Sequence, residues 1–149
     1  MQHDTDNLQL KLAENHYLIK AFAENSFVDL QQFAVMRRAR GRLIGDALLD
    51  EMLAETHHGL AEFARLMALA RPDFVDAAEV HMRILRNPQN LLDAQKMAIS
   101  TGCMLCLALK QLGIDFDHAA DSDRPLFMLI DFGKTPLELL LAGISETGE

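Results

Sequence analysis

The thirteen residues from Met97 to Leu109 contain no charged side chain, and this run sets the strongest limit on the fold. A membrane-spanning helix needs about 20 apolar residues, so the run predicts a buried helix of a folded domain. Over the range of about 91–112, apolar side chains lie on nearly every face of a helix, which is typical of a helix surrounded by others. We therefore predict a helical bundle packed around this segment.

The rest of the chain also favours helices. It contains no Asn-Gly or Asp-Gly pair and no sustained alternation of apolar and polar residues, the usual signals of strands and hairpins. Apolar residues recur every three or four positions in most other segments. We predict a single all-α domain over residues 1–149 with about six helices. The helices around the central one are expected at about 8–23, 27–41, 43–70, 74–86 and 136–143.

Local signals mark several helix ends. Ser26, followed by Asp29, predicts an N-cap with an acidic first turn. Asn90 is expected to cap the central helix, and Gly113 is expected to follow its last turn. Residues 114–125 carry four aspartates and are expected to form a solvated acidic loop.

The net charge and the absence of targeting signals limit the classes of partner and the compartment that we expect. The chain has 22 acidic and 14 basic residues and a net charge of −8, which disfavours nucleic acid and anionic membranes as partners. The N-terminus lacks the basic and apolar regions of a signal peptide, and two cysteines do not form a secreted disulfide framework. We expect a cytoplasmic, bacterial-type protein.

Cys103 and Cys106 form a Cys-x-x-Cys pair on one face of the central helix, a spacing that suits a redox dithiol. In this setting the pair resembles carboxymuconolactone decarboxylases and related all-helical thiol reductases, which implies a thiol-dependent activity. That family has a histidine just after the second cysteine and a glutamate before the first, whereas this chain has Lys110 and Leu91 there. The alternative is that both cysteines are small buried apolar residues.

A second candidate site is metal-binding. Glu55 and His58 have the Glu-x-x-His spacing of di-metal helical bundles, and Glu62 extends the same face. The alternative interpretation is a solvated helix face. No cofactor is predicted. His81 follows the apolar spacing of its helix and is expected to be a hydrogen-bonded core residue.

A third candidate site is basic. Arg37, Arg38, Arg40 and Arg42 lie within six residues and can contact a phosphate or an acidic partner. No aromatic residue lies among them, so a protein partner is favoured over nucleic acid. The alternative is that these arginines pair with the protein's own acidic residues or are simply solvated.

These observations favour a non-catalytic regulatory or adaptor protein that acts through helix-mediated contacts with a protein partner or as a homodimer. No nucleotide or classical nucleophile motif is present. The alternatives are a redox or metal protein, as described above, and a protein that binds a small ligand within the bundle.

Overall fold

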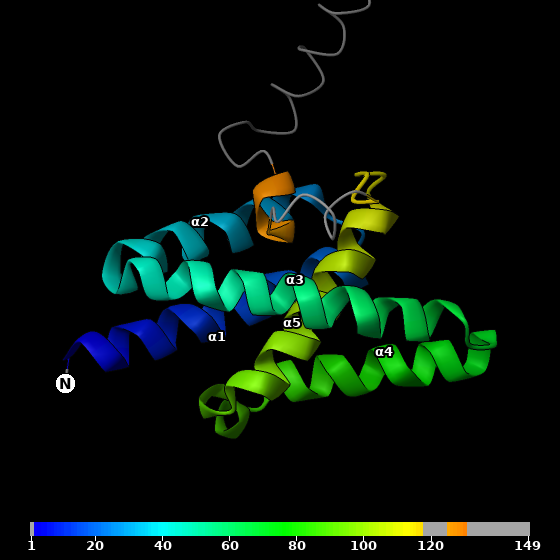
Figure 1. Ribbon diagram of the computed structural model, residues 1–149, viewed down its shortest axis with the longest axis horizontal. Coiled ribbons are helices and arrows are strands. Elements are labelled where there is room, and N and C mark those ends of the chain that lie inside the picture. The colour runs from blue at the N-terminus through cyan, green and yellow to red at the C-terminus, as the bar shows by residue number, and fades with distance from the viewer. Residues whose placement is uncertain (1, 118–124, 131–149) are drawn as a thin grey trace, which may run out of the picture.

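The computed structural model describes residues 2–117 and 125–130, and it contains no strand within them. Five α-helices and two 3-10 helices follow one another (Figure 1). They are α1 (Gln2–Ala23), α2 (Phe27–Ile44), α3 (Asp46–Met67), α4 (Arg71–Arg86), η1 (Pro88–Leu92), α5 (Ala94–Gln111) and η2 (Leu126–Leu129). The predicted all-α bundle is confirmed. The predicted sixth helix, at about 136–143, lies outside the described residues, as does most of the predicted acidic loop.

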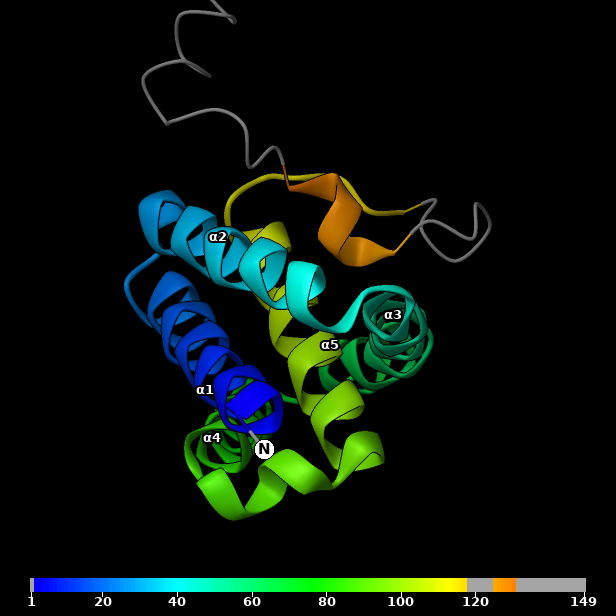
Figure 2. The same cartoon turned by 90° about the vertical axis from the view of Figure 1, so that its left-hand side faces the viewer.

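Helix α5 occupies the centre of the bundle. Figure 2 shows it between the α1–α2 pair on one side and α3 on the other, and it also contacts α4. Every residue from Met97 to Leu109 is buried except Ile99, which is half-buried. Burial of apolar surface is the main stabilising force in such a domain, so the uncharged run acts as the bundle's core. Within the described part of the chain, no helix is both long and apolar enough to cross a membrane.

Helix α2 begins as predicted. The Ser26 side chain accepts a hydrogen bond of 3.1 Å from the backbone N–H of Asp29. Gly45 separates α2 from α3. Its φ is +59°, in the left-handed region that favours glycine, and this conformation ends the helix there. Leu43, which the sequence assigned to the third helix, therefore belongs to the last turn of α2.

The start of α5 differs from the prediction. Asn90 lies in η1, and its side chain donates to the carbonyl of Ile84 instead of capping α5. Asp93 is the N-cap, and its carboxylate accepts a hydrogen bond of 3.0 Å from the N–H of Lys96. The 3-10 helix that begins at Pro88 occupies the residues after α4. The N-cap of α5 therefore lies three residues later than predicted.

Candidate functional site

Helices α1, α2 and α3 each direct two charged side chains toward one another. Within each helix the two residues are three or four positions apart, which places them on one face. We call this group the buried ion cluster. Its members are Lys11, Glu14, Arg37, Arg40, Glu51 and Glu55.

Arg37 lies at the centre of the buried ion cluster and is 0% exposed. Its two Nη atoms donate to the two carboxylate oxygens of Glu55, each at 2.6 Å, and its Nε donates to Glu14 at 3.0 Å. The guanidinium carbon lies 4.9 Å from the ring centre of Phe33 and 5.2 Å from that of Phe127. Burial opposes the charge of Arg37, but the carboxylates of Glu55 and Glu14 raise its pKa above the ordinary value.

Arg40 of α2 links α1 and α3 through its contacts with Glu14 and Glu51. Its Nη1 donates to Glu51 at 3.0 Å, its Nη2 donates to Glu14 at 3.1 Å, and it forms a further short hydrogen bond to each of these carboxylates. Burial tends to raise the pKa of Glu51, but the hydrogen bonds from Arg40 and the charge of Lys11 lower it to about 2. The pKa of Glu14 is lowered for similar reasons, with Arg37 contributing most. Both carboxylates are therefore ionised at neutral pH.

Lys11 is held more loosely. Its Nζ lies 3.5 Å from Glu51, 3.7 Å from Glu55 and 3.9 Å from Glu14. Charge-assisted hydrogen bonds are usually about 2.7–2.9 Å long, so Lys11 adds one positive charge near the three carboxylates without close contact to any of them.

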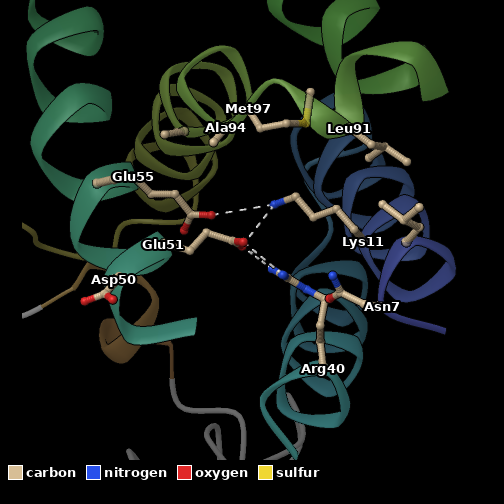
Figure 3. Close-up of a pocket in the computed structure, with 12 residues that line it drawn as sticks. Asn7, Lys11, Arg40, Asp50, Glu51, Glu55, Leu91, Ala94 and Met97 are labelled. Carbon is tan, nitrogen blue, oxygen red and sulfur yellow. Dashed lines mark hydrogen bonds and ion pairs between the residues drawn. The ribbon is translucent and has the colours of Figure 1, made fainter. Parts of the chain in front are cut away.

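A cavity of about 360 Å³ lies against this cluster, between α1, α3 and the start of α5 (Figure 3). We call it the α1/α3/α5 cavity. Its polar lining residues are Asn7, Lys11, Arg40, Asp50, Glu51 and Glu55, and its apolar ones are Leu8, Ala54, Leu91, Ala94, Met97 and Ala98. Figure 3 shows Lys11 and Arg40 reaching toward Glu51 and Glu55 from the opposite side. The Oδ1 atom of Asn7 is buried and accepts no hydrogen bond from the described part of the chain.

A second polar chain links α3, α4 and α5. His81 Nδ1 lies 2.9 Å from the Ser100 hydroxyl, and His81 Nε2 lies 2.7 Å from a carboxylate oxygen of Glu62. This Ser–His–Glu order has the composition of a hydrolase triad, but Ser100 is only 1% exposed and does not line the α1/α3/α5 cavity. A nucleophile must reach its substrate, and the buried Ser100 does not. The contacts between Ser100, His81 and Glu62 therefore serve to satisfy buried polar groups. The sequence prediction that His81 is a hydrogen-bonded core residue is confirmed.

The four arginines predicted as a partner-binding patch separate into two pairs. Arg37 and Arg40 are buried in ion pairs with the protein's own glutamates, which was the alternative interpretation. Arg38 and Arg42 are exposed on α2. Only these two are placed where a protein partner can reach them.

Cys103 and Cys106 are free thiols and both are fully buried in α5. Burial, together with the charge of Glu62, raises the pKa of Cys103 to about 12. Burial also raises the pKa of Cys106, and the neighbouring Cys103 adds to that effect. A redox dithiol needs an accessible thiolate, and this environment favours the neutral thiol.

The structure does not bring the three predicted metal ligands together. Glu55 is paired with Arg37, and Glu62 accepts hydrogen bonds from Arg65 and contacts His81. His58 is half-buried and meets the ring of His57 edge to face. In residues 2–117 and 125–130, no group of three or more His, Cys, Asp or Glu side chains is arranged to hold a metal ion.

The chain matches no protein-family model, no curated protein and no solved structure.

Sequence reasoning named pairing with the protein's own acidic residues as the alternative for the arginines of α2 but did not locate the buried ion cluster or its partners, although a signal for them exists. Glu14 has the same helical spacing as the buried Leu18, and Arg37 and Arg40 continue the spacing of Leu30 and Phe33. Charged residues at positions of an apolar face predict ion pairs inside the bundle. The cavity itself has no such signal, because its lining comes from segments far apart in the chain.

Proposed function

We propose that this protein is a non-catalytic regulatory protein that binds a small molecule in the α1/α3/α5 cavity. The observation that carries the proposal is the lining of the cavity, which combines charged side chains held in ion pairs with apolar side chains. Small-molecule sites commonly have volumes of about 300–1,000 Å³ and combine apolar walls with a few fixed polar groups. A cavity of about 360 Å³ falls in this range.

The protonation states at the cavity favour binding over acid–base catalysis. A general acid or base works best when its pKa is near the operating pH. The pKa of Glu51 is lowered to about 2, and the pKa of Arg40 is raised by Glu51 and Glu14 against the effect of burial. Both groups are held in their charged forms, which suits them to hold and orient a ligand.

The cavity's position gives binding a structural consequence. Its lining joins α1, α3, η1 and α5, and Arg40 extends the connection to α2. A ligand that contacts all these segments stabilises their arrangement by mass action, by about 2.7 kcal/mol at a concentration one hundred times its Kd. A change in the stability or packing of the bundle is how such a protein can report the ligand to a partner.

Native mass spectrometry tests the proposal. Ala94 lines the cavity and is exposed, so Ala94→Trp blocks the cavity without overfilling the core. Ala64→Trp, on an exposed position of α3 away from the cavity, is the matched control. We expect wild type and Ala64→Trp to retain a small-molecule mass that Ala94→Trp loses. A wild-type protein that retains no mass and gains no thermal stability from a metabolite library would contradict the proposal.

The exposed face of α2 supports a second candidate function, an adaptor that binds an acidic protein. Val28, Val35 and Arg42 are seven residues apart and form one exposed stripe, with the two valines 53% and 44% exposed. An apolar stripe that ends in a basic residue fits an amphipathic acidic partner.

A photo-crosslinking residue at position 35 tests this candidate, with position 75 on α4 as the control because Val75 is also 53% exposed. We expect a discrete product from position 35 alone, and we expect Arg42→Glu to reduce it. A product of twice the chain's mass assigns the face to a homodimer instead. Equal products from both positions contradict a specific surface on α2.

A further inference from the structure

The outer face of α3 carries a continuous apolar stripe, which we call the α3 stripe. Leu49, Leu53 and Met67 are 46%, 39% and 41% exposed, and the half-buried Leu60 lies between them. Because a helix has about 3.6 residues per turn, steps of four and seven positions keep these four side chains on one side of it. A helix of 22 residues is about 33 Å long, and the stripe follows most of that length.

The inner side of α3 packs on the bundle, mainly against α5. Figure 2 shows α3 at the edge of the bundle, with the other labelled helices on its inner side. Within residues 2–117 and 125–130, no element covers the α3 stripe, as the exposure of its side chains shows. Single exposed apolar residues are common on protein surfaces, but a row of them along a whole helix is typical of a docking surface.

Charged side chains of opposite sign lie beside the two ends of the α3 stripe. Asp46 and Asp50, at the start of α3, are exposed, and neither forms an ion pair with the described part of the chain. Figure 3 shows the Asp50 carboxylate on the outer side of α3, turned away from Glu51. Arg65 lies in the last turn of α3, and its side chain is 57% exposed.

A second copy of the same helix, packed antiparallel, matches the apolar part of this pattern. A two-fold axis close to His57, near the middle of α3, places Leu49 of one copy opposite Met67 of the other. The same register places Leu53 opposite the small Ala64, so a large side chain meets a small one on each side of the axis. Such complementary pairs let two helices approach closely.

The same register also pairs opposite charges. Asp50 of one copy and Arg65 of the other lie at the same level and beside the same edge of the stripe. A parallel arrangement would instead place each of these residues next to its own copy, where like charges repel. An unrelated acidic or basic partner would find a matching charge at only one end of the α3 stripe. The charges therefore favour a second copy of this chain as the partner.

We infer that this protein forms a two-fold symmetric dimer through antiparallel α3 helices. This inference concerns the outer face of α3 and does not depend on whether the α1/α3/α5 cavity binds a ligand. Helix α3 also supplies Glu51, Ala54 and Glu55 to the lining of that cavity. The helix that forms the dimer interface is thus one that a ligand in the cavity contacts.

Sedimentation velocity at a series of protein concentrations tests the dimer. We expect wild type to show a monomer–dimer equilibrium. Leu53→Glu places a charge within the apolar interface and is expected to raise the dimer dissociation constant at least about tenfold. Ala64→Trp fills the space opposite Leu53 and should also weaken the dimer, although it leaves the cavity open. Val75→Glu, at a 53% exposed valine of α4, is the matched control and is expected to leave the dissociation constant unchanged.

Disulfide cross-linking of introduced cysteines tests the antiparallel register. His57→Cys lies close to the axis and is expected to cross-link to its own copy. Leu49→Cys is expected to form no cross-link alone, because its two copies lie about 27 Å apart along the helices, whereas a disulfide needs a Cα separation of about 5.5–6 Å. A mixture of Leu49→Cys and Met67→Cys is expected to cross-link.

A wild-type protein that is monomeric at every concentration overturns the inference. A dimer that Leu53→Glu leaves unchanged also overturns it, since another surface then joins the two copies. Cross-linking of Leu49→Cys to its own copy would show parallel helices and contradict the antiparallel arrangement. Circular dichroism of each variant shows whether it is folded, so loss of the dimer is distinguished from loss of the fold.

Discussion

Gly59 of α3 and Gly102 of α5 meet backbone to backbone where the two helices cross. A Cβ atom built on Gly59 would lie 2.4 Å from the Cα of Gly102, and one built on Gly102 would lie 2.0 Å from the carbonyl oxygen of Glu55. Only hydrogen atoms fit between these backbones. This crossing brings α3 against the central helix and thereby sets the position of Glu55 opposite Arg37.

Gly102→Ala is expected to destabilise the protein by about 3 kcal/mol, because its methyl group forces two helix backbones apart. Gly41→Ala is the control, since the added Cβ there meets only the end of the Leu48 side chain, at 3.0 Å. A helix interior gains about 1 kcal/mol from the same change, which offsets that contact. Urea denaturation measures both variants. Equal effects at the two positions would show that the crossing tolerates a side chain.

The sequence predicted the fold because local signals agree with the tertiary structure. The uncharged run of α5 and the cap at Ser26 lie where a helical bundle needs them. The site was less predictable. From the sequence, Arg37 and Arg40 were predicted to belong to a surface patch, because four arginines lie close together there. Their partners, Glu14 and Glu55, lie on two other helices, so local spacing does not reveal the pairing. The close approach of Gly59 to Gly102 is also a pairing between distant segments, which periodicity along one helix does not reveal.

Removing two partners of the buried ion cluster together is expected to cost less than the sum of the costs of removing each one alone. Arg37→Met leaves Glu14 and Glu55 as buried carboxylates with weaker compensation, and we expect a loss of about 3–5 kcal/mol. Arg37→Met combined with Glu55→Met is expected to be less destabilising than the sum of the two single variants. Chemical denaturation of the four proteins in a double-mutant cycle measures the coupling. Additive effects would mean that the two side chains do not stabilise each other.

An exposed pair provides the reference for that cycle. Arg65 and Glu62 are joined by hydrogen bonds of 2.7 and 2.8 Å, but the Arg65 side chain is 57% exposed. Arg65→Met is therefore expected to cost less than about 1 kcal/mol.

Stability is expected to fall in acid between about pH 5 and pH 2. Burial raises the pKa of Glu51, but Arg40 and Lys11 lower it from the ordinary 4.5 to about 2 in the folded protein. A carboxyl with a lowered pKa stabilises the fold above its ordinary pKa, and this stabilisation is lost as the pH falls through that range. Urea denaturation at a series of pH values measures the profile. Glu51→Gln should flatten it, and Glu24→Gln, at an exposed glutamate after α1, should leave it unchanged.

The thiols of α5 are expected to react slowly in the folded protein. Cys103 is 0% exposed, and burial with the charge of Glu62 raises its pKa to about 12. Alkylation by iodoacetamide at pH 7.5 should be at least about one hundred times slower in native buffer than in denaturant, because both access and thiolate are lacking. The time course of mass change measures the rate for both cysteines. Rapid labelling of native Cys103 would support the redox alternative.

Thr56 and Thr101, the two threonines buried within residues 2–117 and 125–130, are expected to respond in opposite ways to the same substitution. The Thr56 hydroxyl accepts a hydrogen bond of 2.8 Å from the buried N–H of Leu126 and donates one of 2.9 Å to the carbonyl of Met52. It is thus a polar link between α3 and η2. Thr56→Val keeps the shape but leaves the Leu126 N–H without a partner, which costs about 1–3 kcal/mol.

Thr101 of α5 is 0% exposed, and its hydroxyl has no hydrogen-bond partner in the described part of the chain. Thr101→Val therefore removes an unsatisfied polar group and is expected to be neutral or to stabilise the protein by about 1 kcal/mol. Chemical denaturation compares the two variants, and hydrogen exchange at the Leu126 amide should accelerate in Thr56→Val alone. Equal destabilisation by both substitutions would mean that the loss reflects core packing and that the hydroxyl of Thr56 does not hold η2 in place.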